Sequence, residues 1–322
     1  MKQTRCPIHP TADSHPIVRD AQDQFWGFEG RFDYECCDEC GTWYISPRPT
    51  ESVLSTHYEG YYSTEELLFL RKRFLRRRPN YGVDGLRAWD TIRSLGKLGY
   101  HLDADDTVLD VGCGAGGFLA KLRADTGAQV RGLDTNPRCV RFVEAVHNID
   151  ADCGSLAEQT YAPGHFNMIT AWHCVEHTID PHAEVAFMHT VLAPGGWMVL
   201  EVPTAGLLAR IFRHRWVFLQ APTHLYHFSE EAMRSLVERH GFTVREVKRP
   251  WLPTEFAGSI LFALGMNRFA PRMLFENRPL SNYLWRALMY VLMPVDLVVT
   301  AVVTAVGRGS ALRVIAQKEE SS

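Results

Sequence analysis

The clearest hydrophobic pattern in the chain is a buried strand followed by a glycine-rich loop, a helix and a second strand. Residues 107–111, Thr-Val-Leu-Asp-Val, form a short apolar run with β-branched side chains, which is typical of a buried parallel strand. Glycines recur over residues 112–117, and apolar side chains recur at helical spacing over residues 118–122. The next strand, residues 129–134, ends in Asp134. This order predicts the start of a doubly wound α/β sheet.

The overall composition is that of a folded globular protein. The 322 residues are 46% hydrophobic and 22% charged, and the formal net charge is −3. Such a balance provides no general electrostatic attraction to nucleic acid. The first residues, Met-Lys-Gln-Thr-Arg-Cys-Pro, contain no apolar run of the signal-peptide kind. We therefore expect a cytoplasmic protein in which clustered cysteines are metal ligands more often than disulfides.

The glycine loop has the chemistry of a nucleotide cradle. Glycines let the backbone turn tightly and approach a ligand, and the N–H groups that open the next helix face the same space. Asp134 lies about 20 residues beyond the loop, where doubly wound folds hold a ribose with a carboxylate. The loop lacks the last glycine of the dinucleotide pattern. The stretch Val108–Gly116 resembles motif I of class I S-adenosylmethionine methyltransferases, and Asp134 resembles the ribose-binding acid of their second motif.

This resemblance implies a Rossmann-like, seven-stranded methyltransferase fold of the α/β class, with S-adenosylmethionine as cofactor. The later strands of that fold are expected at residues 166–171, 192–201, 241–244 and 312–316. The resemblance is close from residue 102 to about 248. The residues expected to hold the cofactor are Asp110, Gly112, Cys113, Gly114, Gly116, Asp134, Thr135, Asn136, Gly154, Ser155 and Trp172.

The acceptor is expected beyond the carboxyl end of the strand at 166–171, where ligands gather in such sheets. The sequence there, Trp-His-Cys-Val-Glu-His, resembles a stretch of methyltransferases that act on quinones, sugars and other small molecules. We favour His177 as general base, because neutral imidazole titrates near working pH. His173 and Glu176 are expected beside it. Two alternatives stay open: His177 only shapes the pocket, or Glu176 coordinates a divalent ion.

A second histidine-rich segment, residues 215–229, follows the strand at 192–201. Ser229 with two glutamates after it predicts a helix start, since serine caps and acids suit the first turn. His224 and Tyr226 are candidate acceptor-site residues on a lid before that helix, although His224 could equally anchor the loop.

The N-terminal region predicts a small zinc ribbon. Cys6-x-x-His9 and Cys37-x-x-Cys40 are two short-spaced pairs of the kind that tetrahedral Zn²⁺ needs. Short strands are expected between the pairs, at residues 25–28 and 30–35, and Cys36 is an alternative to Cys37. The region resembles the N-terminal module of bacterial sugar C-methyltransferases. The first pair there is usually two cysteines, so His9 departs from the pattern. A structural zinc ion is expected.

Two further runs carry alternatives. The basic run Arg71–Arg78 would suit a phosphate, an anionic lipid or RNA, or form a solvated helix face. The apolar run at 287–306 approaches the length of a membrane span, but Pro294 and Asp296 interrupt it. The alternatives are a helix in the protein core or at a dimer interface, docking on a membrane surface, and, least favoured, a true span. A hairpin bent at Pro294 or a pair of helices packed on protein is also compatible with the run.

These patterns divide the chain into four segments: a zinc-ribbon-like module (1–62), a helical linker (63–101), a methyltransferase core (102–250), and an apolar helical insertion with the last core strand (251–322). The expected function is methyl transfer to a small-molecule acceptor such as a sugar, a glycolipid or another envelope or secondary-metabolite intermediate. An RNA methyltransferase and a non-catalytic binding module are the alternatives. Membrane-surface association through residues 251–306, at the inner face, and a homodimer are further expectations.

Overall fold

The computed structural model describes residues 4–24, 29–50, 53–54, 67, 70–72, 81–266 and 279–320, without the side chains of residues 279–284 and 286. The strand expected at 25–28 and all but the first two residues of the basic run lie outside these ranges. Arg71 and Lys72, which lie inside them, are exposed.

The core is a single seven-stranded mixed sheet in the order β10-β11-β8-β7-β4-β5-β6. Its strands are β4 Thr107–Val111, β5 Gln129–Asp134, β6 Asp150–Cys153, β7 Phe166–Trp172, β8 Leu192–Pro203, β10 Phe242–Lys248 and β11 Ala311–Lys318. The strands from β8 to β6 are parallel to one another, and β11 runs antiparallel between β8 and β10. The Rossmann-like, seven-stranded fold expected from the sequence is therefore confirmed.

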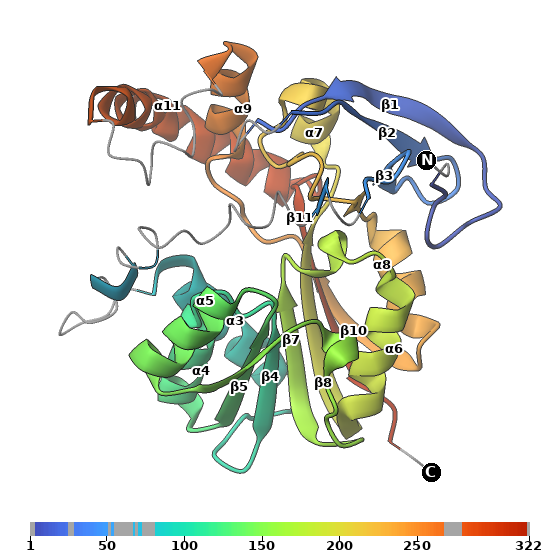
Figure 1. Cartoon of the computed structure of the whole chain (residues 1–322), viewed down its shortest axis with the longest axis vertical. Helices are drawn as coiled ribbons and strands as arrows, with labels where there is room; N and C mark the ends of the chain where they lie inside the picture. The colour runs from blue at the N-terminus through green and yellow to red at the C-terminus, as the bar shows by residue number, and fades with distance from the viewer. Residues whose placement is uncertain are drawn as a thin grey trace.

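Helices cover both faces of this sheet. Figure 1 shows α3, α4 and α5 on one face and α6 and α8 on the other. Their bounds are α3 Gly82–Lys97, α4 Gly117–Thr126, α5 Pro137–Phe142, α6 Pro181–Val191 and α8 Glu230–Glu238, with short turns η1 Val143–His147, η2 Leu156–Glu158, η3 Val175–His177 and η4 Arg213–Arg215. The expected cap at Ser229 is present, because its hydroxyl accepts the N–H of Ala232 at 3.0 Å.

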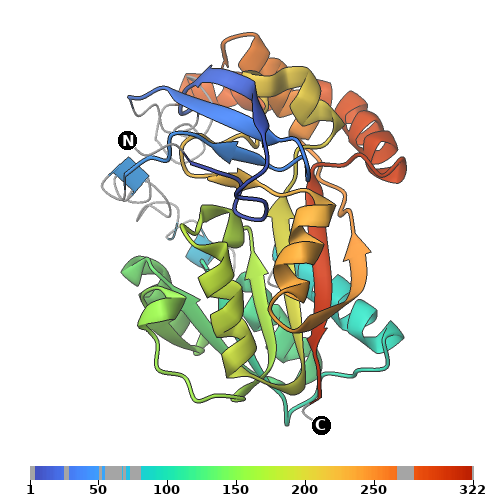
Figure 2. The ribbon, with the colours of Figure 1, turned by 90° about the vertical axis from the view of Figure 1, so that its right-hand side faces the viewer.

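A small antiparallel sheet stands over the core at the carboxyl ends of the parallel strands (Figure 2). It contains β1 Ser14–Ala21, β2 Phe32–Cys37, β3 Trp43–Ile45 and β9 Tyr226–His227. The strand β9 belongs to the second histidine-rich segment, so the core chain supplies the fourth strand of the N-terminal sheet. The Tyr34 hydroxyl adds a hydrogen bond to the carbonyl oxygen of His224 at 2.8 Å. The two sheets also share one hydrophobic cluster, which fixes the N-terminal sheet above the site.

Three helices complete the same end of the molecule: α7 Leu207–Phe212, α9 Glu255–Ala263 and α11 Pro279–Ala305 (Figure 1). Of the alternatives for the apolar run, the hairpin and the helix pair are excluded, because α11 is one continuous helix with Pro294 inside it. A proline removes one backbone hydrogen bond without having to end a helix whose other turns remain bonded.

Asp296 connects α11 to α9. Its side chain is fully buried, and its two carboxylate oxygens accept the backbone N–H groups of Thr254 at 2.6 Å and Ala257 at 2.8 Å. These are N–H groups at the start of α9, which have no partner within that helix. Asp296 therefore acts as an N-terminal cap supplied from a different helix.

Replacing Asp296 by alanine is expected to lower the free energy of unfolding by roughly 3 kcal/mol, because two buried N–H groups lose their acceptor. Asp296→Asn is expected to lose less, since its amide oxygen still accepts one of them. Urea denaturation of the three proteins measures the difference. Equal stability of the alanine variant and the wild type would show that this cap is unimportant.

Candidate functional site

The loop between β4 and α4 has the backbone conformation of a cradle. Gly112, Gly114 and Gly116 all adopt positive φ values of 71°, 53° and 70°, a region that side chains with a Cβ rarely enter. A Cβ on Gly116 would lie 2.8 Å from Cγ2 of Val143. Conformation therefore favours glycine at all three positions, and space requires it at Gly116.

Asp134 stands at the carboxyl end of β5 and is oriented by that loop. One carboxylate oxygen accepts the N–H of Gly114 at 2.8 Å, and the other accepts the N–H of Asn136 at 2.8 Å. Burial raises the pKa of Asp134, and these two hydrogen bonds counteract the rise. Each oxygen keeps a further lone pair, so the carboxylate can accept from two vicinal hydroxyls.

Asp110 lies within β4 and faces β7. It is fully buried, and one carboxyl oxygen accepts the hydroxyl of Thr170 at 2.6 Å. Burial raises its pKa to about 8, although the Thr170 hydrogen bond counteracts this. Asp110 therefore braces the two central strands beneath the loop.

Other residues expected around the cofactor surround this cradle. Cys113 is buried, Asn136 accepts the Arg138 N–H as the cap of α5, and Gly154 donates to the carbonyl oxygen of Asp134 at 3.0 Å. Thr135 comes between Asp134 and Asn136. Ser155 forms a capping box with Glu158.

Trp172, at the end of β7, was expected beside the cofactor, and its ring packs against protein side chains. Its ring centroid lies 4.9 Å from that of Phe118. The guanidinium carbons of Arg87 and Arg313 stand over it at 5.2 Å and 4.9 Å. Trp172 is thus part of a packed aromatic and cationic layer below the carboxyl end of the strand.

A carboxylate with three imidazoles around it follows β7. Glu176, in η3, is completely buried. Its Oε1 lies 3.4 Å from Nδ1 of His173, 4.0 Å from Nε2 of His177 and 3.9 Å from Nε2 of His224. Within the described part of the chain, neither of its oxygens has a hydrogen-bond partner. The two histidine-rich stretches, far apart in the sequence, therefore meet at this carboxylate.

The orientation of two of these imidazoles follows from their backbone contacts. Nδ1 of His177 lies 2.7 Å from the carbonyl oxygen of Thr223, and Nδ1 of His224 lies 2.9 Å from that of Phe218. A carbonyl only accepts, so Nδ1 carries the hydrogen in both rings. The Nε2 atoms of both rings then face Glu176. Burial lowers the pKa of His224 well below its ordinary value, which keeps this ring neutral.

His173 is held between two buried carboxylates. Its Nε2 lies 3.3 Å from Oε1 of Glu201. Burial alone would lower its pKa, but Glu176 and Glu201 raise the pKa of His173 to about 9. His173 also has a φ of 51°, which is uncommon for a residue other than glycine. The structure therefore fixes an imidazolium beside the cluster, in a conformation that the surroundings have to maintain.

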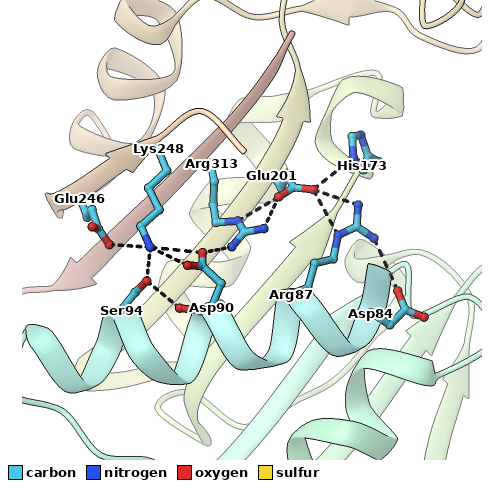
Figure 3. A network of polar contacts seen from close by, with 9 residues as sticks. All are labelled: Asp84, Arg87, Asp90, Ser94, His173, Glu201, Glu246, Lys248 and Arg313. Carbon is cyan, nitrogen blue, oxygen red and sulfur yellow. Dashed lines mark hydrogen bonds and ion pairs between the residues drawn. The ribbon is translucent and has the colours of Figure 1, made fainter. Parts of the chain in front are cut away.

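Glu201, at the end of β8, organises a polar network that the sequence analysis missed (Figure 3). Arg87 from α3 donates to its Oε1 at 2.9 Å, and Arg313 from β11 donates to its Oε2 at 2.9 Å. Burial alone would raise the pKa of Glu201, but His173 and the two arginines lower it well below its ordinary value. Arg313 also pairs with Asp90 on α3. The signal in the sequence was a charged residue within each of two apolar runs, Glu201 in β8 and Arg313 in β11.

Tyr226 is placed away from this cluster. Its hydroxyl donates to the carbonyl oxygen of Ile179 at 3.2 Å and accepts from Arg48. Tyr226 therefore connects the loop after η3 to the N-terminal sheet.

Three of the four expected zinc ligands come together in that sheet. The sulfur atoms of Cys6, Cys37 and Cys40 are buried and lie within 4.8 Å of one another, and those of Cys6 and Cys40 are 3.7 Å apart. The Cys6 thiol lowers the pKa of Cys40 to about 5. His9 is not part of this cluster. Its Nδ1 pairs with Glu39 at 2.6 Å, while its Nε2 is buried without a hydrogen-bond partner among the described residues.

Comparison with known proteins agrees with this fold and cradle. Residues 73–247, more than half of the chain, match the family model described as "Methyltransferase domain". A ubiquinone biosynthesis O-methyltransferase from Albidiferax ferrireducens is 28% identical over 184 residues, covering 50% of this chain and 72% of that protein. Another from Burkholderia thailandensis is 30% identical over 158 residues, covering 42% and 67%.

Solved structures show the same fold. Phosphoethanolamine N-methyltransferase 2 from Haemonchus contortus, determined with S-adenosyl-L-methionine, superimposes with a TM-score of 0.56 at 14% identity, covering 100% of this chain and 71% of that one. The [4+2]-cyclase SpnF superimposes with a TM-score of 0.53 at 15% identity, covering 85% and 99%. The chain belongs to the class I S-adenosylmethionine-dependent methyltransferases. It is an enzyme that transfers a methyl group from S-adenosylmethionine.

The imidazolium of His173 predicts a pH-dependent stability. Its pKa in the folded protein, about 9, exceeds the ordinary value of 6.5, so its contribution is fully present below pH 6.5 and is lost as the pH rises through 9. We expect the free energy of unfolding to fall by roughly 3 kcal/mol over this range relative to His173→Asn, which has no titrating group and tolerates the positive φ. Urea denaturation at both ends of the range measures the difference. Parallel curves for the two proteins would contradict the assignment.

Proposed function

We propose that the enzyme methylates a hydroxyl or an acidic carbon of a small-molecule acceptor, such as a sugar, a glycolipid or another envelope or secondary-metabolite intermediate. The observation that carries the proposal is that the glycine cradle and the Glu176 cluster lie next to each other. The strands β4 and β7 pair in parallel, and a Cβ on Gly112 would lie 3.1 Å from the sulfur of Cys174. A donor held by the first loop would thus present its methyl group next to the second.

In this proposal the cofactor is held by backbone and by one carboxylate. The Gly112–Gly116 loop approaches the adenosyl group, and Asp134 accepts hydrogen bonds from the ribose hydroxyls. When bound, S-adenosylmethionine supplies an electrophilic methyl group on its sulfonium sulfur. The protein contributes mainly alignment, because a displacement needs the acceptor atom close to and in line with the methyl carbon.

His177 is the proposed general base. Its Nδ1 donates to the carbonyl oxygen of Thr223, and its Nε2 is the atom proposed to accept a proton from the acceptor. The carboxylate of Glu176 would stabilise the imidazolium that forms. His173 and His224 would line the rest of the acceptor site. Burial of Glu176 and His224 keeps water from the reacting atoms.

A second role for this cluster is supported by the same atoms. The ligand atoms of Glu176, His177 and His224 lie within 4.8 Å of one another, and two imidazoles with one carboxylate are a recognised donor set for a divalent cation. In that case turnover would depend on added Mg²⁺ or Zn²⁺ and disappear with a chelator. A histidine base requires neither.

We further propose a structural zinc ion bound by Cys6, Cys37 and Cys40, with His9 as the fourth ligand. Sulfur atoms that share one tetrahedral zinc lie about 3.8 Å apart, and the Cys6–Cys40 distance of 3.7 Å agrees with that spacing. The contact of His9 with Glu39 through Nδ1 is of the kind that orients a ligating histidine.

The methyl-transfer proposal is tested by two variants with different expected losses. Asp134→Ala should abolish binding of S-adenosylmethionine in calorimetry, because the ribose hydroxyls lose their acceptor. His177→Ala should bind the donor as the wild type does, yet transfer methyl about 100-fold more slowly or worse, as expected for loss of a general base.

Candidate acceptors for the transfer assay come from the sugar, glycolipid and quinol classes, with labelled donor. Full turnover of His177→Ala would show that this residue only shapes the pocket. Transfer to RNA that weakens steeply with salt would favour the RNA alternative. Failure of the wild type to bind the donor would favour a non-catalytic module.

The zinc proposal predicts stoichiometric zinc in the purified wild-type protein by elemental analysis. Cys37→Ser should lose most of it and melt at a lower temperature, since structural zinc stabilises the fold that binds it. Cys153→Ser, a change at an exposed cysteine outside the cluster, is the matched control and should retain the metal. Wild-type protein from zinc-supplemented cells that contains no zinc would disprove the site.

A further inference from the structure

The helix α11 exposes a long apolar surface that the described part of the chain leaves uncovered. Its segment Ala287–Ala305 is long and apolar enough to cross a membrane by length and composition alone, with a mean hydropathy of 2.0, yet only 17% of it is buried. We call six exposed apolar residues on α11 and directly after it the α11 face: Tyr290, Val291, Val295, Val298, Val302 and Val306.

Neighbouring elements extend this surface. Ile211 on α7, Trp251 and Leu264 are also exposed, and α7, α9 and α11 gather at one end of the molecule in both views (Figures 1 and 2). Val291 is 72% exposed and Val298 is 64% exposed. An exposed apolar patch of this extent is uncommon on a monomeric protein in water and marks an interaction site.

The exposed charged side chains on the segments that form this surface are of one sign. Within residues 207–215, 251–265 and 287–308, the two acids, Glu255 and Asp296, are both buried. Glu255 accepts the indole N–H of Trp216 at 2.8 Å, and Asp296 caps α9. The exposed charged side chains in these ranges are all arginines: Arg210, Arg213 and Arg308.

We propose that α7, α9 and α11 form a docking surface for an anionic lipid bilayer, with α11 lying in the plane of the interface. An uncharged apolar face flanked by cations is the composition of an interfacial helix. The arginines would meet lipid phosphates, and Trp251 and Tyr290 would sit at the headgroup level that aromatic rings prefer.

The attachment of α11 to the fold explains why it lies on the bilayer instead of crossing it. Asp296, in the middle of the helix, is bonded to the backbone of α9. The chain then enters β11, whose residues Ala311–Gln317 pair with Pro203–Trp197 of β8. Both the middle of the helix and the residues after it are thus fixed on the protein side.

A bilayer fits this surface better than a second copy of the chain. Two copies docked through the same face would bring arginines together, and the described part of that face offers no exposed carboxylate to pair with them. Phosphate headgroups supply that negative charge. The charge distribution therefore distinguishes between the two occupants.

The test is sedimentation of the full chain with vesicles of phosphatidylglycerol and phosphatidylethanolamine, compared with vesicles of phosphatidylcholine alone. The wild type should bind the anionic vesicles and bind the neutral ones more weakly. Val291→Asp with Val298→Asp should reduce binding to both at least tenfold, because it places charges on the apolar face. Arg213→Gln with Arg308→Gln should reduce binding to the anionic vesicles only.

The matched control is Ala124→Asp with Ala183→Asp, which adds the same two charges at exposed positions on α4 and α6, and it should bind as the wild type does. Every variant is also tested for its melting temperature and for donor binding, so that loss of vesicle binding is separated from unfolding. Unchanged binding of the Val291/Val298 variant would overturn the proposal. The proposal would also be overturned if the wild type bound neither kind of vesicle. This holds whether the wild type is a monomer or a dimer that the double change Val291→Asp with Val298→Asp dissociates.

Discussion

The buried carboxylate of Glu201 is the interaction on which the arrangement of the site depends. A charge removed from water is tolerated only when it is fully paired, and Glu201 meets this requirement with Arg87, Arg313 and His173. Those partners come from a helix before the sheet, from strand β11 and from the loop after β7. One ionised group thus fixes three distant segments, and removing any partner would leave a buried charge uncompensated. The positive φ of His173 is maintained by this pairing.

Parallel pairing then brings the chemistry to one edge. Because β4, β5, β7 and β8 end at the same side of the sheet, Asp134, the glycine loop and Glu176 become neighbours without any contact in sequence. The second histidine-rich segment crosses above them and contributes both His224 and the strand β9. As a result, the N-terminal sheet is built partly from the residues that enclose the site. The stability of that sheet therefore affects the geometry of the site.

The sequence predicted what local patterns encode. Apolar runs located the strands of the core, glycine spacing located the loop beside Asp134, and the serine cap located a helix start. Each of these features depends on residues within one short segment. The Glu201 network, the pairing of β3 with β9 and the meeting of Glu176 with His224 depend on residues separated by long stretches of chain, which spacing does not reveal. The bend at Pro294, one of the alternatives for the apolar run, is not observed for a related reason. Tertiary contacts such as the Asp296 cap maintain a helix that its local sequence would interrupt.

The position of β11 has a consequence for the order of folding. This strand sits between β8 and β10, so β10 has no place in the sheet until the chain has passed through α9 and α11 and returned. During synthesis, the edge of β8 is therefore exposed until β11 exists, and α11 is made before the sheet that anchors it is complete. Strand pairings between residues this distant in sequence form slowly, and the partly folded intermediates are prone to aggregate. The nascent protein should accordingly depend on chaperones, or on early capture of α11, more than its compact final form suggests.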